Sequence, residues 1–170
     1  MKKNDFISDL ENGVVLHKQT IGLNDRNSGI LRKLNYVFEG LGVSWVLTGT
    51  AAIALLGIPT GVHDIDVKVF ELSDTARKAL EGMQTVAGAL PDYPGEQKCY
   101  SFKVDGVIVN VLLSESPEPY INVKWEMDDG IRIGFKVQPL IYAIRDKMKL
   151  NRSKDHHFMF NLIQTLTSLC

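Results

Sequence analysis

The chain has 170 residues, of which 45% are hydrophobic and 23% charged, and its formal net charge is -1. These proportions are ordinary for a globular protein, and the length predicts one domain over residues 1–170. The near-zero charge excludes a general basic field for nucleic acid, which would need a local patch. Two cysteines, Cys99 and Cys170, exclude a disulfide framework and favour a reducing, cytoplasmic setting. The longest apolar run, Trp45 to Pro59, is interrupted by polar and glycine residues, so no membrane span is expected.

Two segments precede the most informative part of the chain. Residues 1–23 have weak periodicity and are interpreted as a peripheral arm. Asn27 or Ser28 is then expected to cap a helix. Apolar residues recur at helical spacing from Ile30 to Leu41, and Gly40 and Gly42 end the element. This stripe predicts a core helix.

Residues 45–70 predict a strand, a tight turn, a short helix and a second strand. Trp45 to Leu47 form the first strand, and Gly49-Thr50 makes a turn without bulky side chains. Helix formers follow over 51–56, and Gly57 and Pro59 stop them. From Asp64 to Phe70 the pattern alternates, with Ile65, Val67 and Val69 on one face and Asp64, Asp66 and Lys68 on the other.

Two aspartates on one strand face repel each other and can share a cation. The side-chain origins of Asp64 and Asp66 lie roughly 6–7 Å apart, given the rise per residue of a strand. Mg²⁺ is the natural candidate, since it is held by one or two carboxylates and substrate phosphates. The Gly49-Thr50 turn leads into a helix N-terminus, which favours phosphate. The alternative is an edge strand with solvated aspartates and an ordinary glycine turn.

The remaining elements predict further strands and helices. Ser73 caps a helix running to about Ala89, and residues 90–97 form a loop. Asp105-Gly106 joins two alternating strands, and Asp128-Asp129-Gly130 joins two more. Helices fill residues 138–170, one starting at Pro139 and one capped by Ser153. The predicted class is α/β, a mixed sheet covered by helices.

One stretch carries a family resemblance. The residues from Leu47 to Pro59, Leu-Thr-Gly-Thr-Ala-Ala-Ile-Ala-Leu-Leu-Gly-Ile-Pro, precede Asp-Ile-Asp-Val at 64–67. The pattern resembles the polymerase-beta-type nucleotidyltransferase superfamily, and most of all its small prokaryotic branch with the AbiEii-type proteins. The resemblance implies that Asp64 and Asp66 hold the nucleotide-bound metal, that Gly49 and Thr50 cradle phosphate, and that a third carboxylate stands at position 110.

Position 110 departs from the family pattern. Asn110 is the only polar residue inside the strand Val107–Leu113, and a buried amide needs partners. Its carbonyl oxygen can ligate a cation, but it brings no charge and cannot act as a general base. The family's second, catalytic metal is therefore in doubt. Thr60 and Val62 also stand where the branch has Arg and Thr, and Lys68 is either a substitute phosphate partner or a partner of nearby carboxylates.

A run of cationic residues near the C-terminus is the last candidate part of the site. Its members are Arg145, Lys147, Lys149, Arg152 and Lys154. The resemblance places Lys147 and Lys154-Asp155 near the nucleotide. The alternative is a solvated helix face. His63 is a candidate for the rim of the site, whereas His156 and His157 are expected at the surface.

The sequence thus leaves three hypotheses. The first is Mg²⁺-dependent transfer of a nucleotidyl group from an NTP to the hydroxyl of RNA, a protein or a small molecule, with Asp64, Asp66 and Asn110 catalytic. The second is a binding module that has lost catalysis and senses a nucleotide or partner. The third is half of a toxin–antitoxin pair that acts with a partner chain.

Overall fold

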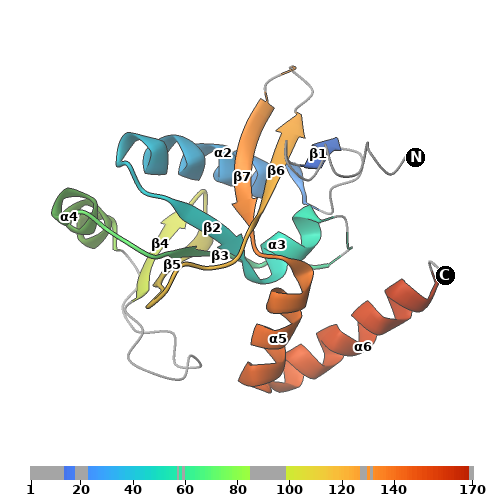
Figure 1. The fold of residues 1–170 in the computed structure, drawn as a ribbon. Coiled ribbons are helices and arrows are strands. Elements are labelled where there is room, and N and C mark those ends of the chain that lie inside the picture. The colour runs from blue at the N-terminus through green and yellow to red at the C-terminus, as the bar shows by residue number, and fades with distance from the viewer. Residues whose placement is uncertain are drawn as a thin grey trace.

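The computed structural model of the protein describes residues 14–17, 23–56, 58, 60–84, 99–126, 130 and 132–168. Within these residues a mixed sheet has seven strands in the order β1-β6-β7-β2-β3-β5-β4, with helices packed on it (Figure 1). The predicted α/β class is confirmed. The strands are β1 (Val14–His17), β2 (Trp45–Thr48), β3 (Asp64–Val69), β4 (Cys99–Val104), β5 (Val107–Leu113), β6 (Ile121–Glu126) and β7 (Arg132–Val137). The helices are α2 (Asp25–Gly40), α3 (Gly49–Leu55), α4 (Asp74–Met83), α5 (Leu140–Leu150) and α6 (Ser153–Ser168).

Strand β3 lies near the middle of the sheet and carries both aspartates. It pairs antiparallel with β2 and parallel with β5. β4 and β5 form one antiparallel hairpin, and β6 and β7 form the other. Part of the arm expected over residues 1–23 is an edge strand, because β1 pairs in parallel with β6. The rest of that arm up to residue 22 lies outside the described residues.

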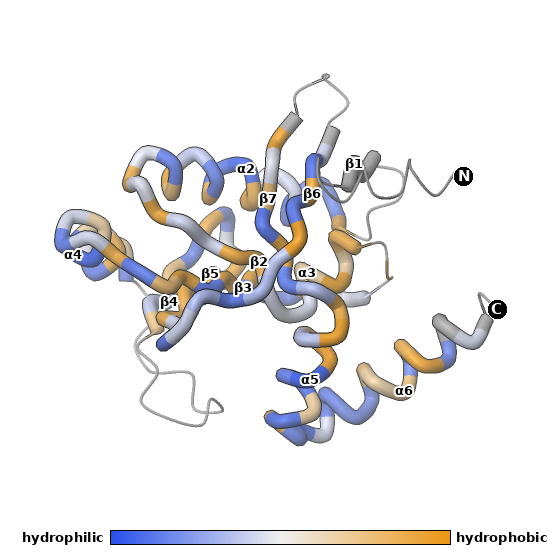
Figure 2. Tube along the Cα trace, in the orientation of Figure 1, coloured by the Kyte–Doolittle hydropathy of each residue, from blue (hydrophilic) through white to orange (hydrophobic). Residues whose placement is uncertain are grey.

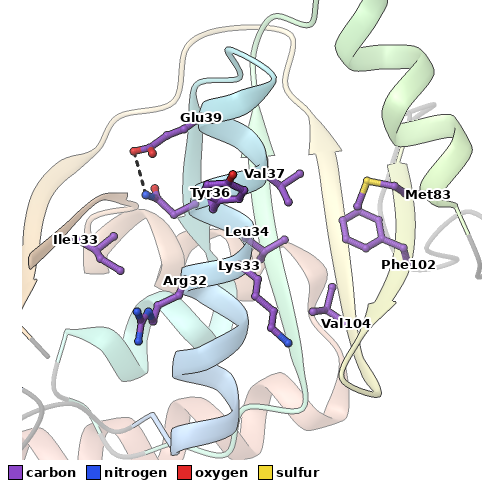
Figure 3. Close-up of a pocket in the computed structure, with 11 residues that line it drawn as sticks. Arg32, Lys33, Leu34, Tyr36, Val37, Glu39, Met83, Phe102, Val104 and Ile133 are labelled. Atoms are coloured by element: carbon purple, nitrogen blue, oxygen red, sulfur yellow. Dashed lines mark hydrogen bonds between the residues drawn. The ribbon is translucent and has the colours of Figure 1, made fainter. Parts of the chain in front are cut away.

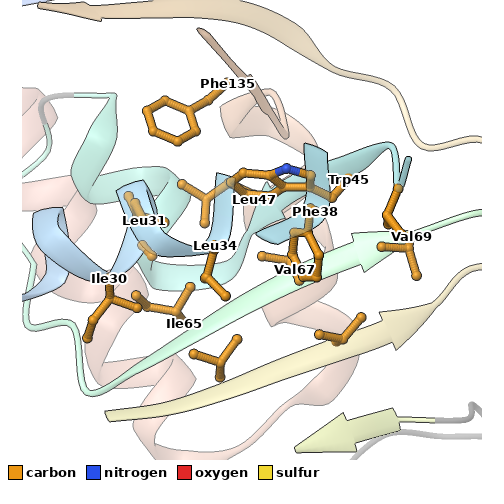
Figure 4. Packing of buried hydrophobic residues seen from close by; sticks show 14 of the residues in the cluster. Ile30, Leu31, Leu34, Phe38, Trp45, Leu47, Ile65, Val67, Val69 and Phe135 are labelled. Carbon is orange, nitrogen blue, oxygen red and sulfur yellow. The ribbon is translucent and has the colours of Figure 1, made fainter. Parts of the chain in front are cut away.

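The core lies between the sheet and α2. The alternation on β3 is confirmed, since Ile65, Val67 and Val69 are buried against the apolar stripe of α2 (Figure 4). Phe38 and Trp45 extend this cluster, with ring centroids 5.6 Å apart. Burying each large apolar side chain stabilises the fold by about 1.5–3 kcal/mol. The hydrophobic segments accordingly gather at the centre, while the junction of α5 and α6 is hydrophilic (Figure 2).

Three helix ends differ from the sequence prediction. The side chain of Asn24, not Asn27 or Ser28, caps α2 by accepting from the backbone N–H of Asn27, at 2.8 Å. Asn24 lies one turn earlier and has the extended backbone that a cap requires. Helix α3 begins at Gly49 itself. Helix α4 is capped by Ser73 as predicted but ends at Met83, because Gln84 is extended. Gly57 and Pro59, predicted to stop α3, lie outside the described residues.

The hairpin prediction at Asp105-Gly106 is confirmed. Both residues have positive φ, 50° and 76°, as a two-residue hairpin turn of the primed type needs. The second hairpin is confirmed by the antiparallel register of β6 and β7, although Asp128 and Asp129 of its turn lie outside the described residues. Helix α5 begins after Pro139, and α6 begins at Ser153. No helix in the described ranges is long and apolar enough to cross a membrane.

Candidate nucleotide and metal site

Asp64 and Asp66 open onto a polar cleft of about 400 Å³ between β3 and the last two helices. One side carries the two carboxylates, and the other carries cationic side chains from α5, α6 and their junction. The structure therefore brings together residues that lie about 80 positions apart in the chain. The lining residues are Thr50, Thr60, Gly61, His63, Asp64, Asp66, Lys147, Arg152, Lys154, Asp155, His157, Phe158 and Asn161.

The two carboxylates differ in their surroundings. Burial, followed by the charge of Asp64, raises the pKa of Asp66 from 3.8 to about 6, although Asn110, Lys147 and Arg152 oppose the shift. The carboxylate of Asp64 makes no hydrogen bond or ion pair among the described residues. An acidic pair with an unfavourable mutual interaction is an arrangement that a divalent cation would relieve.

Gly49 fits closely against the Asp66 carboxylate. Its φ is +65°, in the left-handed region, and a Cβ at this position would lie 2.8 Å from Asp66 Oδ2. Glycine is therefore required here both by the backbone conformation and by the approach of the carboxylate. Thr48, just before it, donates through Oγ1 to the carbonyl oxygen of Asp66, at 3.2 Å. The turn that was predicted to cradle phosphate is thus in direct contact with Asp66.

Lys147 provides the central positive charge of the cleft. Its Nζ donates to Thr50 Oγ1 at 3.3 Å, lies 3.6 Å from Asp155 Oδ1, and stands 4.6 Å from the ring centroid of Phe158. Burial lowers the pKa of Lys147, and the charge of Asp155 opposes this. The lysine therefore joins the beginning of α3 to the beginning of α6.

Asp155 organises the cationic side of the cleft. It is 2% exposed, and its Oδ2 accepts from Arg152 Nε at 2.6 Å. Burial alone would raise the pKa of Asp155, but the hydrogen bond and charge of Arg152 outweigh it and lower that pKa. Lys154 is exposed on the rim of the cleft. Arg145 and Lys149, which belong to the same cationic run in the sequence, are not among the lining residues of this cleft.

Asn110 lies behind the carboxylates and does not line the cleft. It is 1% exposed, its Nδ2 donates to Asp66 Oδ1, and its Oδ1 accepts from Ser101, both at 2.8 Å. The sequence argument that a buried amide here needs partners therefore agrees with the geometry. Its carbonyl oxygen is turned towards Ser101, whereas ligation of a cation would require that oxygen in the cleft.

Lys68, predicted to bind the nucleotide, is not among the lining residues of this cleft. Its Nζ lies 3.1 Å from Asp146 Oδ2 and 3.2 Å from Glu118 Oε1, and it is 9% exposed. Burial would raise the pKa of Asp146, but a hydrogen bond from Gln138 and the charge of Lys68 lower it. Asp146 directly precedes Lys147, so this partly buried pair holds α5 against the sheet next to the lysine of the cleft.

The residues present fit a divalent cation held jointly with a ligand. In the described part of the chain no three His, Cys, Asp or Glu side chains are grouped to enclose an ion. Asp64 and Asp66 offer carboxylate oxygens on one strand face, which is the set that Mg²⁺ uses when phosphates and water complete its shell.

Some residues that line or support the cleft were not identified from the sequence. Ser101 is one, because a polar residue is ordinary at this position of the alternating strand Cys99–Val104 and gave no signal. Asp146 and Glu118, the partners of Lys68, gave no signal, because nothing in the local pattern relates them to β3. His157, expected only at the surface, is exposed and lines the cleft with Asn161.

A larger hollow, of about 620 Å³, lies along α2 on the other side of the sheet (Figure 3). Its lining is mostly apolar, with Phe102, Val104 and Met83 on one side of the helix and Ile133 on the other. It contains neither carboxylate of β3. The candidate site is therefore the polar cleft.

Comparison with known proteins supports the fold. No protein-family profile and no curated protein sequence matches the chain. A solved structure does match, and it is described as "a putative nucleotidyltransferase" from Thermotoga maritima. The identity is 19%, the TM-score is 0.54, and the match covers 88% of this chain and 99% of that one. At this identity the similarity establishes a nucleotidyltransferase-like fold.

Proposed function

We propose that the protein binds a nucleoside triphosphate with a divalent cation, Mg²⁺ in the cell, and transfers its nucleotidyl group to an acceptor hydroxyl. The observation that carries the proposal is the cleft itself, in which Asp64 and Asp66 face Lys147, Arg152 and Lys154. Carboxylates for a cation and ammonium or guanidinium groups for phosphates within one cleft are what a metal-bound triphosphate needs.

Each residue has a role in this proposal. Asp64 and Asp66 would hold the cation, whose chemistry is to neutralise charge on the phosphates. Lys147, Lys154 and Thr50 would orient the triphosphate, and the contribution of the α3 dipole is small because that helix has seven residues. Phe158 and His157 offer surfaces for the base or ribose.

The transfer step would be a substitution at the α-phosphorus. The acceptor oxygen forms a bond to that phosphorus, the bond to the oxygen bridging to the β-phosphate breaks, and pyrophosphate leaves. The acceptor proton passes to water. Lys147 and Arg152, which line the cleft, would stabilise the charge on the departing pyrophosphate.

The position of Asn110 favours a second candidate function, nucleotide binding without transfer. A buried amide beside Asp66 cannot accept the proton of an attacking hydroxyl. In that case the fold would sense a nucleotide or a partner chain. We place the chain with the small prokaryotic AbiEii-like branch as part of the same proposal, on the pattern from Leu47 to Val67.

Two measurements test these candidates. Calorimetry with ATP, CTP, GTP and UTP in Mg²⁺ should show binding of at least one of them, and Asp64→Ala should abolish it while Lys149→Ala, outside the cleft, should not. Absence of binding to all four in the wild-type protein would refute both candidates.

Incubation with α-labelled NTPs and bulk RNA or protein then separates transfer from sensing. Label retained on an acceptor, and lost in Asp64→Ala, supports transfer. Binding without any retained label supports the sensing function.

A further inference from the structure

A row of polar side chains crosses four strands beneath the cleft. The strand register aligns Thr48 of β2 with Asp66 of β3, Asp66 with Asn110 of β5, and Asn110 with Ser101 of β4. Thr48, Ser101 and Asn110 are each at most 3% exposed. Buried polar groups need hydrogen-bond partners, and here Thr48 donates to the backbone carbonyl of Asp66, Asn110 to its carboxylate, and Ser101 to Asn110. The row therefore fixes the orientation of each member, including Asp66.

The orientation of the Asn110 amide follows from its neighbours. If the amide were turned over, its oxygen would face Asp66 Oδ1, and two acceptors would stand 2.8 Å apart. The hydroxyl of Ser101 can donate, and it does so to Asn110 Oδ1 at 2.8 Å. Ser101 and Asp66 thus hold the amide from both sides, with its NH₂ towards the carboxylate.

This orientation changes what the site can hold. An NH₂ group is a donor and cannot ligate a cation, and it takes one of the two acceptor sites of Asp66 Oδ1. The ligands for a cation on this strand face are therefore the oxygens of Asp66, of which Oδ1 already accepts a hydrogen bond, and those of Asp64. On β5 the side chains that share the face of Asp64 and Asp66 are those of Ile108, Asn110 and Leu112, so this strand supplies no third carboxylate. Two cations would therefore have to share two carboxylates.

We propose that the site holds a single divalent cation with its nucleotide, and that Ser101 is the positioning residue that maintains this state through Asn110. The inference rests on the proposed nucleotide binding and specifies its metal stoichiometry. Ser101 touches neither ligand nor cleft. It acts by keeping the amide turned and Asp66 Oδ2 available beside Gly49.

Counting bound Mn²⁺ by electron paramagnetic resonance tests the stoichiometry. The protein is saturated with a non-hydrolysable analogue of the nucleotide that binds best, and bound Mn²⁺ is compared with bound nucleotide. One Mn²⁺ per bound nucleotide supports the inference, and two overturn it. Failure of the analogue to bind at all refutes the proposed function instead, so the two failures are distinguishable.

Asn110→Asp supplies the missing carboxylate and should raise the count to two. A count that stays at one in a folded Asn110→Asp variant overturns the role given to the amide. If this variant does not fold, the Mn²⁺ count of the wild-type protein still tests the stoichiometry, and the Mn²⁺ affinity of the Ser101 variants still tests the positioning role.

Ser101→Ala removes the donor to Asn110 and should weaken Mn²⁺ binding about 10-fold, the lower end of the range for partners of metal ligands. Ser101→Thr keeps the hydroxyl and should restore the affinity. The matched control is Ser114→Ala, which breaks an equally short bond, 2.8 Å to Glu118 Oε1, outside the cleft. A Ser101→Ala variant with wild-type Mn²⁺ affinity would exclude a positioning role.

Discussion

Replacing Asp66 by asparagine should stabilise the protein at pH 8 while removing its capacity to hold a cation. The carboxylate is buried beside Asp64, which raises its pKa from 3.8 to about 6. Asparagine removes the charge and keeps an oxygen that can accept from Asn110 Nδ2. The substitution therefore separates the electrostatic cost of this carboxylate from its structural contacts.

The magnitude follows from the pKa shift. A difference of about 2 units between the folded and unfolded states corresponds to about 3 kcal/mol, at about 1.4 kcal/mol per unit. This is an upper value, because asparagine is also a polar group in a buried place. We expect a gain of about 1–3 kcal/mol at pH 8, and each kcal/mol raises the melting temperature by about 2–4 °C in a chain of this length.

The sign depends on pH. Because the folded pKa of Asp66 is the higher one, the folded state binds more protons than the unfolded state between about pH 4 and pH 6. The wild-type free energy of unfolding therefore falls as pH rises through this window. The advantage of Asp66→Asn should be near zero at pH 4 and complete above about pH 7.

Urea denaturation in EDTA at pH 4, 5, 6, 7 and 8 measures this difference. The control is Glu81→Gln, which removes the same charge from an exposed position on α4 and should change stability little. A gain in Asp66→Asn that does not vary with pH, or a loss at pH 8, would refute the view that Asp66 is held charged at a cost to the fold.

Four further outcomes are expected. Gly49→Ala and its control Gly42→Ala should each lower the free energy of unfolding by about 1–2 kcal/mol, because both glycines have positive φ. Only Gly49→Ala should abolish nucleotide binding in calorimetry, since its Cβ would displace Asp66, whereas Gly42 has open space around it. Lys68→Met should lower the free energy of unfolding in urea by about 2–3 kcal/mol, because it removes the cation between Glu118 and Asp146. Lys33→Met, in an exposed pair, should lower it by under about 1 kcal/mol, and equal costs would contradict the anchoring role. Lys147→Met should weaken nucleotide binding about 10–100-fold and Lys149→Met should not, and a reversed order would disprove the assignment of the cleft. Binding of Mn²⁺ alone should strengthen about 10-fold per pH unit up to the Asp66 pKa of about 6 and then level off, whereas a flat profile would exclude Asp66 as a ligand.

The local pattern of the sequence was enough to predict much of the fold. The stripe of α2, the alternation on β3 and the Asp105-Gly106 turn each depend on neighbours in the chain, and each prediction is confirmed. The capping prediction at Asn27 failed because Asn24 offered an equally suitable side chain one turn earlier. The end of α4 at Met83 was missed because apolar residues at helical spacing continue beyond it in the sequence, at Val86 and Ala87.

Relations between distant strands could not be predicted. A single strand pattern does not say which strand lies beside it, so the alignment of Ser101 with Asn110, and hence with Asp66, was not found. The same holds for Lys68, whose partner Asp146 lies 78 positions further along the chain. The carboxylates at 64 and 66 were predicted as a site from their local spacing, and that assignment stays a prediction.

The acidic and cationic sides of the cleft come from opposite parts of the chain, and this has a consequence during synthesis. Asp66 leaves the ribosome about 80 residues before Lys147, which at roughly 5–20 residues per second is about 4–16 s. The emerging chain therefore carries both aspartates before any of the lysines that would balance them. The cleft is complete only after α5 and α6 have been translated and have packed against the rest of the fold. Incomplete chains are therefore not expected to bind nucleotides.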